Sequence, residues 1–204
     1  MRFLDKNKER NKNNVLGKRI VVFAGPSGSG KNTIMHEIIK RSKKISKFVT
    51  ATTRKKREGE KDGVDYYFLS EEEFKEKMKQ GLIPEHNIHA FNYYGTYLPD
   101  LDKKLKEGKI VFGQVQLVGA KYLKENYNAL TLFFVADSLK VLEERIRQRS
   151  KLSEEEIKER IRVAKREIEE ESKFYDYIIE NKQDQLEETV EKVIKILKKE
   201  GIKI

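Results

Sequence analysis

The sequence predicts an α/β fold with a parallel core sheet flanked by helices, on three observations. Short apolar runs typical of strands buried on both faces alternate with amphipathic stretches of helical period. A glycine-rich segment directly follows the first apolar run and precedes the first helical stretch. Two segments, 70–73 and 153–156, have the N-cap hydroxyl and the third-residue carboxylate of a capping box. Strands that alternate with helices favour parallel pairing, because each helix returns the chain across the sheet.

The elements are expected in a regular order. Residues 19–24 form the first strand because they are largely β-branched or aromatic, and a helix at 33–40 follows the glycines. Further buried strands are expected at 109–115, 130–135 and 177–179, and helices at 138–149 and 153–171. A last helix carries one apolar stripe, made of Leu186, Val190, Val193 and Leu197.

The segment 64–92 interrupts this alternation and predicts a small mixed α/β lobe inserted in the parallel sheet. No linker rich in proline, glycine or serine divides the chain, so independent domains are not expected. We expect a basic flexible tail at 1–17 and one domain at 18–204. Its core comprises 18–49 and 97–204, its inserted lobe about 50–96, and a helical lid about 145–160.

Composition excludes several classes of protein. The chain of 204 residues contains no cysteine, which excludes disulfides and cysteine-based zinc sites and fits a reducing compartment. No apolar run approaches the roughly 20 residues of a membrane span, and the N-terminus does not resemble a signal peptide. We therefore expect a soluble cytoplasmic protein with no membrane partner.

The formal net charge of +10 raises the question of a nucleic-acid partner. The excess is concentrated, with a net +5 in residues 1–19 and +8 in residues 40–61, so the remainder is slightly acidic. An even basic coat would favour nonspecific binding to a polyanion, whereas a concentrated charge requires a local explanation. No specific nucleic acid is expected, although the tail would bind polyanions loosely.

The glycine-rich segment has the form of a phosphate-binding loop. Residues 25–33 stand between the expected first strand and first helix, where glycines let backbone N–H groups turn toward a phosphate. Lys31 is placed to reach the outer phosphates. The segment comprises Gly25, Pro26, Ser27, Gly28, Ser29, Gly30, Lys31, Asn32 and Thr33.

A second motif, T-T-R-x-x-R-x-G-E-x-x-G-x-D-Y-x-F at 52–68, combines with this loop and with 92–96 (N-Y-Y-G-T). Together they resemble guanylate kinases, and the resemblance extends from about residue 18 to the C-terminus. It implies a P-loop nucleoside monophosphate kinase fold and transfer of the γ-phosphoryl group of ATP to GMP, with the loop binding ATP. The lobe would then bind GMP, and the partners would be ATP and GMP, in a monomer or weak homodimer.

The resemblance also assigns roles within the lobe. Arg54 and Arg57 have planar forks suited to a monophosphate dianion, and they would act with the hydroxyls of Tyr66 and Tyr94. Guanine selection is assigned to Glu85, Thr50 and Thr96. The carboxylate would accept two hydrogen bonds from the N1–H and amino edge of guanine, which adenine does not present.

The resemblance places lid arginines over the donor triphosphate, where they would stabilise charge on the transferred phosphoryl group. The matching positions are Arg145, Arg149 and Arg160, which with Lys31 and Arg54 make up the expected catalytic set. Asn181 matches an asparagine near the donor adenine, although a turn residue fits that position equally well. Arg147 is expected to lie on a solvated helical face.

Three positions depart from the family pattern. Asn32 replaces the serine or threonine that ligates Mg²⁺, so the metal ligand would be Asn32 or the neighbouring Thr33. Gln114 and Gln116 replace two acids near the metal and the acceptor, and they are kept here among the GMP-binding candidates. Mg²⁺ is expected to arrive with ATP, held mostly by phosphates and water.

Two functions remain open on these residues. The first is an ATP-dependent guanylate kinase, which retention of Lys31 and the lid arginines favours. The alternative is a catalytically weakened binding module that recognises GMP or a phosphorylated peptide, which the lost acids favour.

Overall fold

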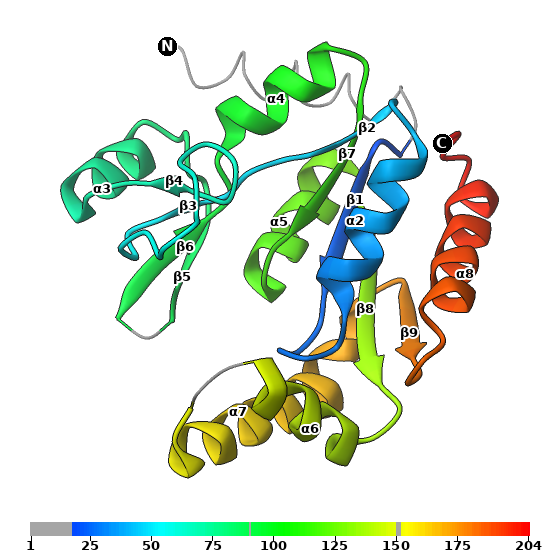
Figure 1. Cartoon of the computed structure of the whole chain (residues 1–204). Coiled ribbons are helices and arrows are strands. Elements are labelled where there is room, and N and C mark those ends of the chain that lie inside the picture. Colours follow the sequence, from blue (N-terminus) through cyan, green and yellow to red (C-terminus); the bar gives the residue numbers. More distant parts are fainter. Residues whose placement is uncertain (1–17, 90, 150–151) are drawn as a thin grey trace. The chain divides into compact units, whose positions relative to one another are not determined.

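The computed structural model describes residues 18–89, 91–149 and 152–204, so the predicted tail at 1–17 and residues 150–151 of the predicted lid lie outside the described residues. The chain is α/β, as predicted (Figure 1). It divides into two compact units. The first comprises the chain up to Val22 and Lys44–Leu130, and the second comprises Phe23–Lys43 and Thr131–Ile204. The proposed boundaries of core, lobe and lid stay predictions.

The parallel strands of the first unit are β1 (Ile20–Ala24, of which this unit holds the first three residues), β7 (Ile110–Gln114) and β2 (Ile45–Lys47). Their order is β2-β7-β1, and β2 pairs with β7 in parallel. All five residues of β1 are buried, as expected for a central strand with apolar residues on both faces. The strand over 45–47 was not among the predicted elements.

The predicted mixed lobe is present in the first unit as a four-stranded sheet of order β4-β3-β6-β5. Its strands are β3 (Ala51–Thr52), β4 (Tyr67–Phe68), β5 (His86–His89) and β6 (Asn92–Gly95). β3 pairs with β4 in parallel, whereas β6 is antiparallel to both β3 and β5. Helix α3 (Glu71–Lys79) places Phe74 in a small core with Ala51 and Ile83.

Two further helices of the first unit, α4 (Leu98–Lys106) and α5 (Leu117–Tyr127), were not predicted. Helix α4 is short and has a proline in its first turn. Helix α5 contains a glycine in its first turn, and it ends at Asn128 in the left-handed conformation, a common helix stop.

The second unit continues from Phe23 and Ala24 of β1 into β8 (Leu130–Ala136) and β9 (Tyr177–Asn181), in the order β1-β8-β9. β8 and β9 are parallel. Its helices are α2 (Lys31–Arg41), α6 (Leu139–Arg149), α7 (Glu154–Arg166) and α8 (Leu186–Lys199). A π-helical turn (Glu167–Glu171) and a 3₁₀ turn (Ser172–Phe174) follow α7, and the predicted helix at 153–171 ends in them.

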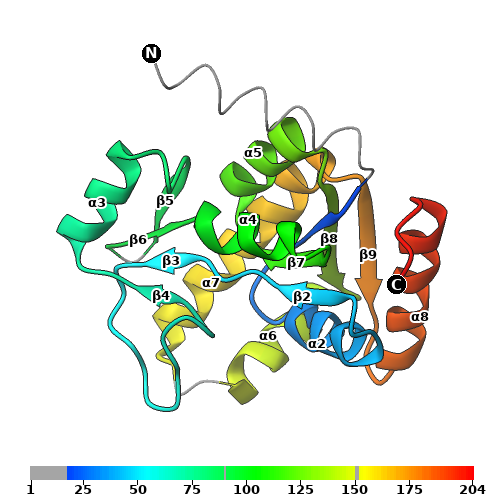
Figure 2. The ribbon, with the colours of Figure 1, turned by 90° about the horizontal axis from the view of Figure 1, so that it is seen from above.

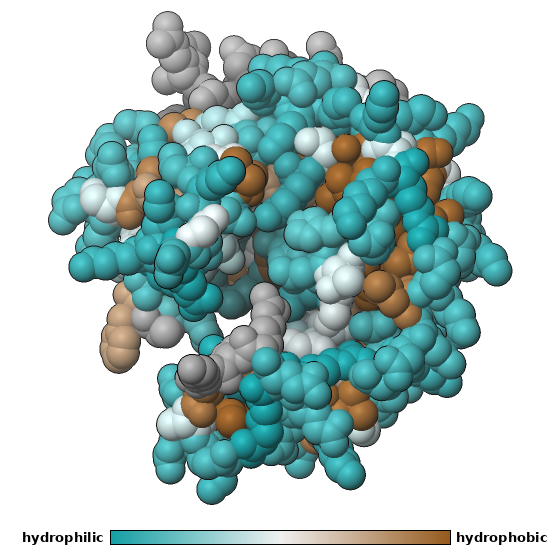
Figure 3. Space-filling view, in the orientation of Figure 1, coloured by the Kyte–Doolittle hydropathy of each residue, from teal (hydrophilic) through white to brown (hydrophobic). Residues whose placement is uncertain are grey.

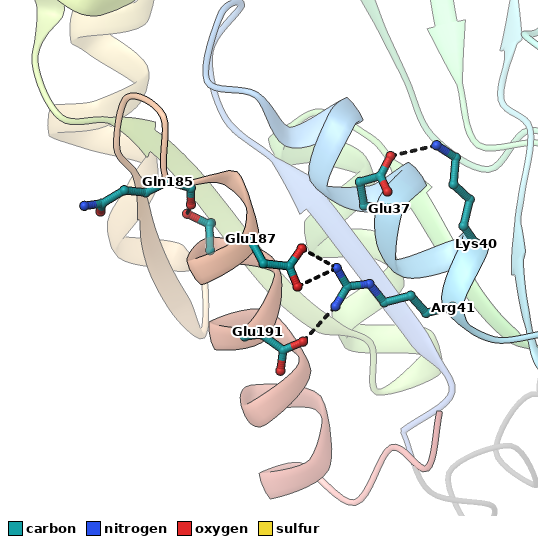
Figure 4. A network of polar contacts seen from close by, with 7 residues as sticks. Glu37, Lys40, Arg41, Gln185, Glu187 and Glu191 are labelled. Atoms are coloured by element: carbon teal, nitrogen blue, oxygen red, sulfur yellow. Dashed lines mark hydrogen bonds and ion pairs between the residues drawn. The ribbon is translucent and has the colours of Figure 1, made fainter.

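Helices α2 and α8 lie side by side (Figures 1 and 2). Figure 4 shows the polar contacts between them: the guanidinium of Arg41 binds Glu187 at 2.6 Å and Glu191 at 2.7 Å. The stripe of α8 is buried at Val190, Val193 and Leu197 as predicted, but Leu186 at the helix start is exposed. Leu186 is the first residue of α8, so no preceding turn of the helix covers its side chain.

Both predicted capping boxes are confirmed. Ser70 caps α3 and Ser153 caps α7, each with the reciprocal bond from the third helical residue. Polar side chains cover most of the face in Figure 3. In the described ranges, no helix combines the length and apolarity that a membrane crossing requires.

Candidate active site

The phosphate loop connects β1 with α2 inside the second unit. Gly25, Gly28 and Gly30 have φ angles of 131°, 86° and 83°, which L-residues with side chains rarely adopt. Two of these glycines are also required for space. A Cβ atom on Gly25 would lie 2.2 Å from the carbonyl oxygen of Phe134, and one on Gly30 would lie 2.1 Å from Nδ2 of Asn181. The loop therefore has the glycine-dependent conformation that the sequence predicted.

The amino end of α2 opens on this loop. Gly30 is the N-cap and offers no side-chain cap, so the first backbone N–H groups of the helix have no capping side chain. Lys31, the first helical residue, donates from Nζ to the carbonyl oxygen of Pro26 at 3.1 Å and so extends back over the loop. Asn32 is half-buried and Thr33 is exposed. Backbone donors and a cation thus converge at a helix N-terminus, which is the usual arrangement for binding phosphate.

Two predicted lid arginines contact the same loop. Nη1 of Arg145 lies 3.5 Å from the carbonyl oxygen of Gly28, and both of its terminal nitrogens lie 3.3 Å from that of Asn181. Nη1 of Arg160 lies 3.5 Å from Oγ of Ser27. The backbone of Arg149 ends α6, and its side chain lies outside what the structure describes. The structure therefore brings Lys31, Arg145 and Arg160 to one loop.

Asn181 has a defined structural contact. It is buried at the end of β9, and Nδ2 donates to the carbonyl oxygen of Ser29 at 2.9 Å. Asn181 therefore supports the phosphate loop directly, and its expected position near adenine stays a prediction.

Arg147 has different partners. It binds Glu143 and Glu154 at 2.7 and 2.5 Å, and these two carboxylates raise its pKa. The expectation that it belongs to a solvated helical face is confirmed.

The phosphate-binding candidates of the first unit surround Arg54. Nη2 of Arg54 donates to Oε1 of Glu60 at 2.7 Å, and the guanidinium carbon lies 5.5 Å from the centre of the Tyr66 ring. The rings of Tyr66 and Tyr94 meet edge to face at 5.9 Å. Burial and the neighbouring Tyr94 raise the pKa of Tyr66, so its hydroxyl stays protonated and able to donate to an anion. Arg54, Tyr66 and Tyr94 are therefore brought together.

Arg57 is exposed, and its backbone N–H donates to Oε2 of Glu60 at 2.8 Å. Glu60 thus contacts both arginines of the motif, through the side chain of Arg54 and the backbone of Arg57. The backbone carbonyl oxygen of Thr50 accepts from the backbone N–H of Tyr67 at 2.9 Å, so Thr50 lies beside β4.

Among the base-binding candidates, Glu85 directly precedes β5 and Thr96 directly follows β6, while Gln114 and Gln116 lie at the end of β7 and the start of α5. Oε1 of Glu85 accepts a hydrogen bond from the backbone N–H of Thr96 at 2.9 Å. Burial raises the pKa of the Glu85 carboxyl, and hydrogen bonds from Thr96 oppose the shift. Gln114 ends β7, and Gln116 is the N-cap of α5, where it accepts from Nδ2 of Asn87. The half-buried carboxylate of Glu85 and the neutral amides of Gln114 and Gln116 are thus the polar groups offered by these base-binding candidates.

Three residues were missed by the sequence reasoning: Glu60, Gly119 and Glu167. Glu60 stood in the motif without a role. Gly119, where an added Cβ would lie 2.9 Å from Oε1 of Glu85, gave no signal because α5 was not predicted. Glu167 begins the π-helical turn. Burial and Glu171 raise its pKa while Lys31 lowers it, so a carboxyl group lies within electrostatic reach of the loop lysine.

The oxygen donors near the loop suit a magnesium ion that is carried by a nucleotide. Among the described residues, no three histidine, cysteine or acidic side chains are grouped to hold a metal. Asn32 and Thr33 offer neutral oxygens at the start of α2. Mg²⁺ in proteins keeps several waters and takes phosphate oxygens together with few protein ligands. Asn32 and Thr33 fit this coordination, because each could supply at most one neutral oxygen ligand to the ion.

Comparison with known proteins identifies the family of the chain. A family model described as guanylate kinase matches residues 17–200. A guanylate kinase from Prochlorococcus marinus subsp. pastoris is 39% identical over 182 residues, which is 89% of this chain and 97% of that protein. One from Chlorobium luteolum is 38% identical over 178 residues, covering 86% and 89%. The crystal structure of guanylate kinase from Anaplasma phagocytophilum has a TM-score of 0.72 and 30% identity, covering 92% of this chain and 88% of that chain.

Proposed function

This chain belongs to the guanylate kinase family, and on that premise we propose that it transfers the γ-phosphoryl group of ATP to GMP, forming ADP and GDP. The observation that carries the proposal is the convergence of Lys31, Arg145 and Arg160 on the phosphate loop. A phosphopeptide-binding module has no use for a donor triphosphate site. The binding-module alternative is accordingly not favoured.

The second unit would hold ATP. The backbone N–H groups of the loop and of the first turn of α2 bind the phosphates, and Lys31 exchanges its bond to Pro26 for a phosphate oxygen. Arg145 and Arg160 stabilise the charge on the transferred group, and Arg149 joins them as the family pattern implies. Asn181 keeps the loop in shape through Ser29.

The first unit would hold GMP. Arg54 and Arg57, with the hydroxyls of Tyr66 and Tyr94, bind the monophosphate, and Glu85 accepts hydrogen bonds from the guanine N1–H and amino group. Thr50, Thr96, Gln114 and Gln116 complete the proposed set. A phosphate oxygen of GMP forms the new bond to the γ-phosphorus while the bond between that phosphorus and the β,γ-bridging oxygen breaks, so ADP carries the bridging oxygen away.

Mg²⁺ would be held by ATP phosphates and water, with Asn32 or Thr33 as a protein ligand, and would neutralise phosphate charge. The protein contributes the positioning and the arginine cations. We further propose a cytoplasmic monomer or weak homodimer, since the absence of cysteine fits a reducing compartment.

The test is an assay coupled to ADP release with GMP, dGMP, AMP and UMP as acceptors, with and without Mg²⁺. We expect turnover with GMP and none above the ATPase background with AMP or UMP. GMP binding without turnover would overturn the kinase assignment in favour of the binding module. Glu85→Ala should weaken GMP far more than the control Arg147→Ala, and equal effects would remove the guanine assignment.

A further inference from the structure

Gly119 stands in a place where glycine is unfavourable. It is the third residue of α5 and is buried, and glycine destabilises helices more than any residue except proline. Its φ angle is not in the left-handed region, where eight other glycines of the described chain lie. An alanine could adopt the same backbone conformation. The reason for a glycine here is therefore the space that a side chain would occupy, and not the backbone conformation.

The carboxylate of Glu85 lies next to the space that a side chain at position 119 would fill. A Cβ atom on Gly119 would lie 2.9 Å from Oε1 of Glu85 and 2.9 Å from Cβ of Val115, closer than real Cβ atoms approach such neighbours. The glycine therefore lets the first turn of α5 close against the carboxylate.

A shift of the Glu85 side chain away from an added methyl group would disturb a hydrogen bond. Its carboxylate is bonded to the backbone N–H of Thr96. Its own main chain is packed against β6, because a Cβ on Gly95 would lie 2.6 Å from the carbonyl oxygen of Glu85. An added Cβ on Gly119 would consequently rotate the carboxylate away from its bond to Thr96.

We propose that Gly119 is a positioning residue for guanine recognition: its missing side chain fixes the orientation of the Glu85 carboxylate, and any larger residue relaxes the selection of guanine. This inference rests on the proposed function, in which Glu85 binds the base. Unlike a general packing role, it predicts a change in the choice between purines.

Inosine monophosphate (IMP) is the ligand to compare with GMP because it lacks the amino group of the guanine base. A correctly placed carboxylate accepts two hydrogen bonds from GMP and one from IMP. Rotation of the carboxylate therefore costs GMP more than IMP, and the preference for GMP falls.

The experiment measures dissociation constants for GMP and IMP by titration calorimetry. The chains compared are the wild type, Gly119→Ala, Glu85→Ala and the double variant, with Glu125→Ala as a control at an exposed position of the same helix. We expect Gly119→Ala to weaken GMP about tenfold or more, the scale of one lost charged hydrogen bond, and IMP less. In the Glu85→Ala background the same substitution should have no further effect. ATP binding should be unchanged throughout.

An unchanged preference for GMP over IMP in folded Gly119→Ala would overturn the inference, as would an equal effect of that substitution in the Glu85→Ala background. If Glu85→Ala itself binds GMP like the wild type, the guanine assignment of the proposed function is what fails. Should Gly119→Ala not fold, Val115→Gly is compared with Val115→Gly/Gly119→Ala. Because Val115→Gly removes the clash with Val115, these two variants differ only in the contact between residue 119 and Glu85. An equal preference for GMP over IMP in both variants would again overturn the inference.

Discussion

Nδ2 of Asn181 donates a hydrogen bond to the carbonyl oxygen of Ser29 at 2.9 Å, and both residues are buried. The bond joins the end of the last strand to the phosphate loop. Removing the amide leaves a buried carbonyl group without this donor.

Asn181→Ala should therefore lower the free energy of unfolding by about 1–3 kcal/mol, the cost of an unsatisfied buried polar group. It should also raise KM for ATP while KM for GMP stays unchanged. Urea denaturation and initial rates measure the two effects, with Lys182→Ala at the adjacent exposed position as the control. An Asn181→Ala enzyme with wild-type stability and KM for ATP would show that the bond is dispensable.

Glu60 holds Arg54, the arginine that we propose binds the phosphate of GMP. It bonds Arg54 at 2.7 Å, and the same arginine donates to the carbonyl oxygen of Lys55 at 2.8 Å. Glu60→Ala should raise KM for GMP by about tenfold because Arg54 loses its fixed orientation, with a smaller change in kcat. Steady-state kinetics with Glu58→Ala as the exposed control would reveal this, and a lower KM would mean that Glu60 competes with the phosphate.

Binding of GMP should depend on pH through Glu85. Only the ionised carboxylate accepts both hydrogen bonds of guanine, and burial raises the pKa of this group above its ordinary 4.5. Lowering the pH through that raised pKa therefore weakens GMP, with a midpoint above 4.5. Titration calorimetry between about pH 4 and 8 follows the effect. Glu85→Gln should bind weakly at every pH and lack this dependence, and a wild-type midpoint at or below 4.5 would contradict the assignment.

Arg145 and Arg147, two of the three arginines of α6, should differ sharply in catalysis. Arg145 contacts Gly28 and Asn181 beside the loop, whereas Arg147 is held by Glu143 and Glu154. Arg145→Ala should reduce kcat about 100-fold, the scale for loss of one charge-stabilising donor. Arg147→Ala should leave kcat within about twofold, since exposed ion pairs contribute little. Similar losses in both variants would remove Arg145 from the catalytic set.

Gly113 and Phe48 should be coupled in stability. A Cβ on Gly113 would lie 1.7 Å from Cε1 of Phe48, whose ring is buried. Gly113→Ala should cost about 3 kcal/mol in the free energy of unfolding, from overpacking in a core strand. Combined with Phe48→Ala, it should cost less than the sum of the two single changes. Additive losses in urea denaturation would show that the core relaxes around the new methyl group.

The sequence predicted the features that depend on neighbours along the chain. The phosphate loop and the capping boxes at Ser70 and Ser153 are local chemical patterns, and each is present. Helices α4 and α5 escaped prediction because proline and glycine in their first turns weaken the periodic signal.

Contacts between distant segments were not predictable from one sequence. The bond from Asn181 to Ser29 and the approach of Gly119 to Glu85 arise only when separate elements pack. Motif order assigned residues such as Arg54 and Glu85 to one half of the site, but it gave no indication of what orients them.

The chain passes between the two units three times: inside β1, between Val22 and Phe23; in the connection from α2 to β2, between Lys43 and Lys44; and after the first residue of β8. Lys43 and Lys44 at the second crossing are exposed, whereas the first and third crossings are made by buried strand residues. A recombination event at either point would cut a central strand. Exchange of either unit as a whole therefore requires breaks within buried strands, so a change of the acceptor that we propose for the first unit is expected from substitutions, such as those at Gln114 and Gln116, and not from transfer of a whole unit.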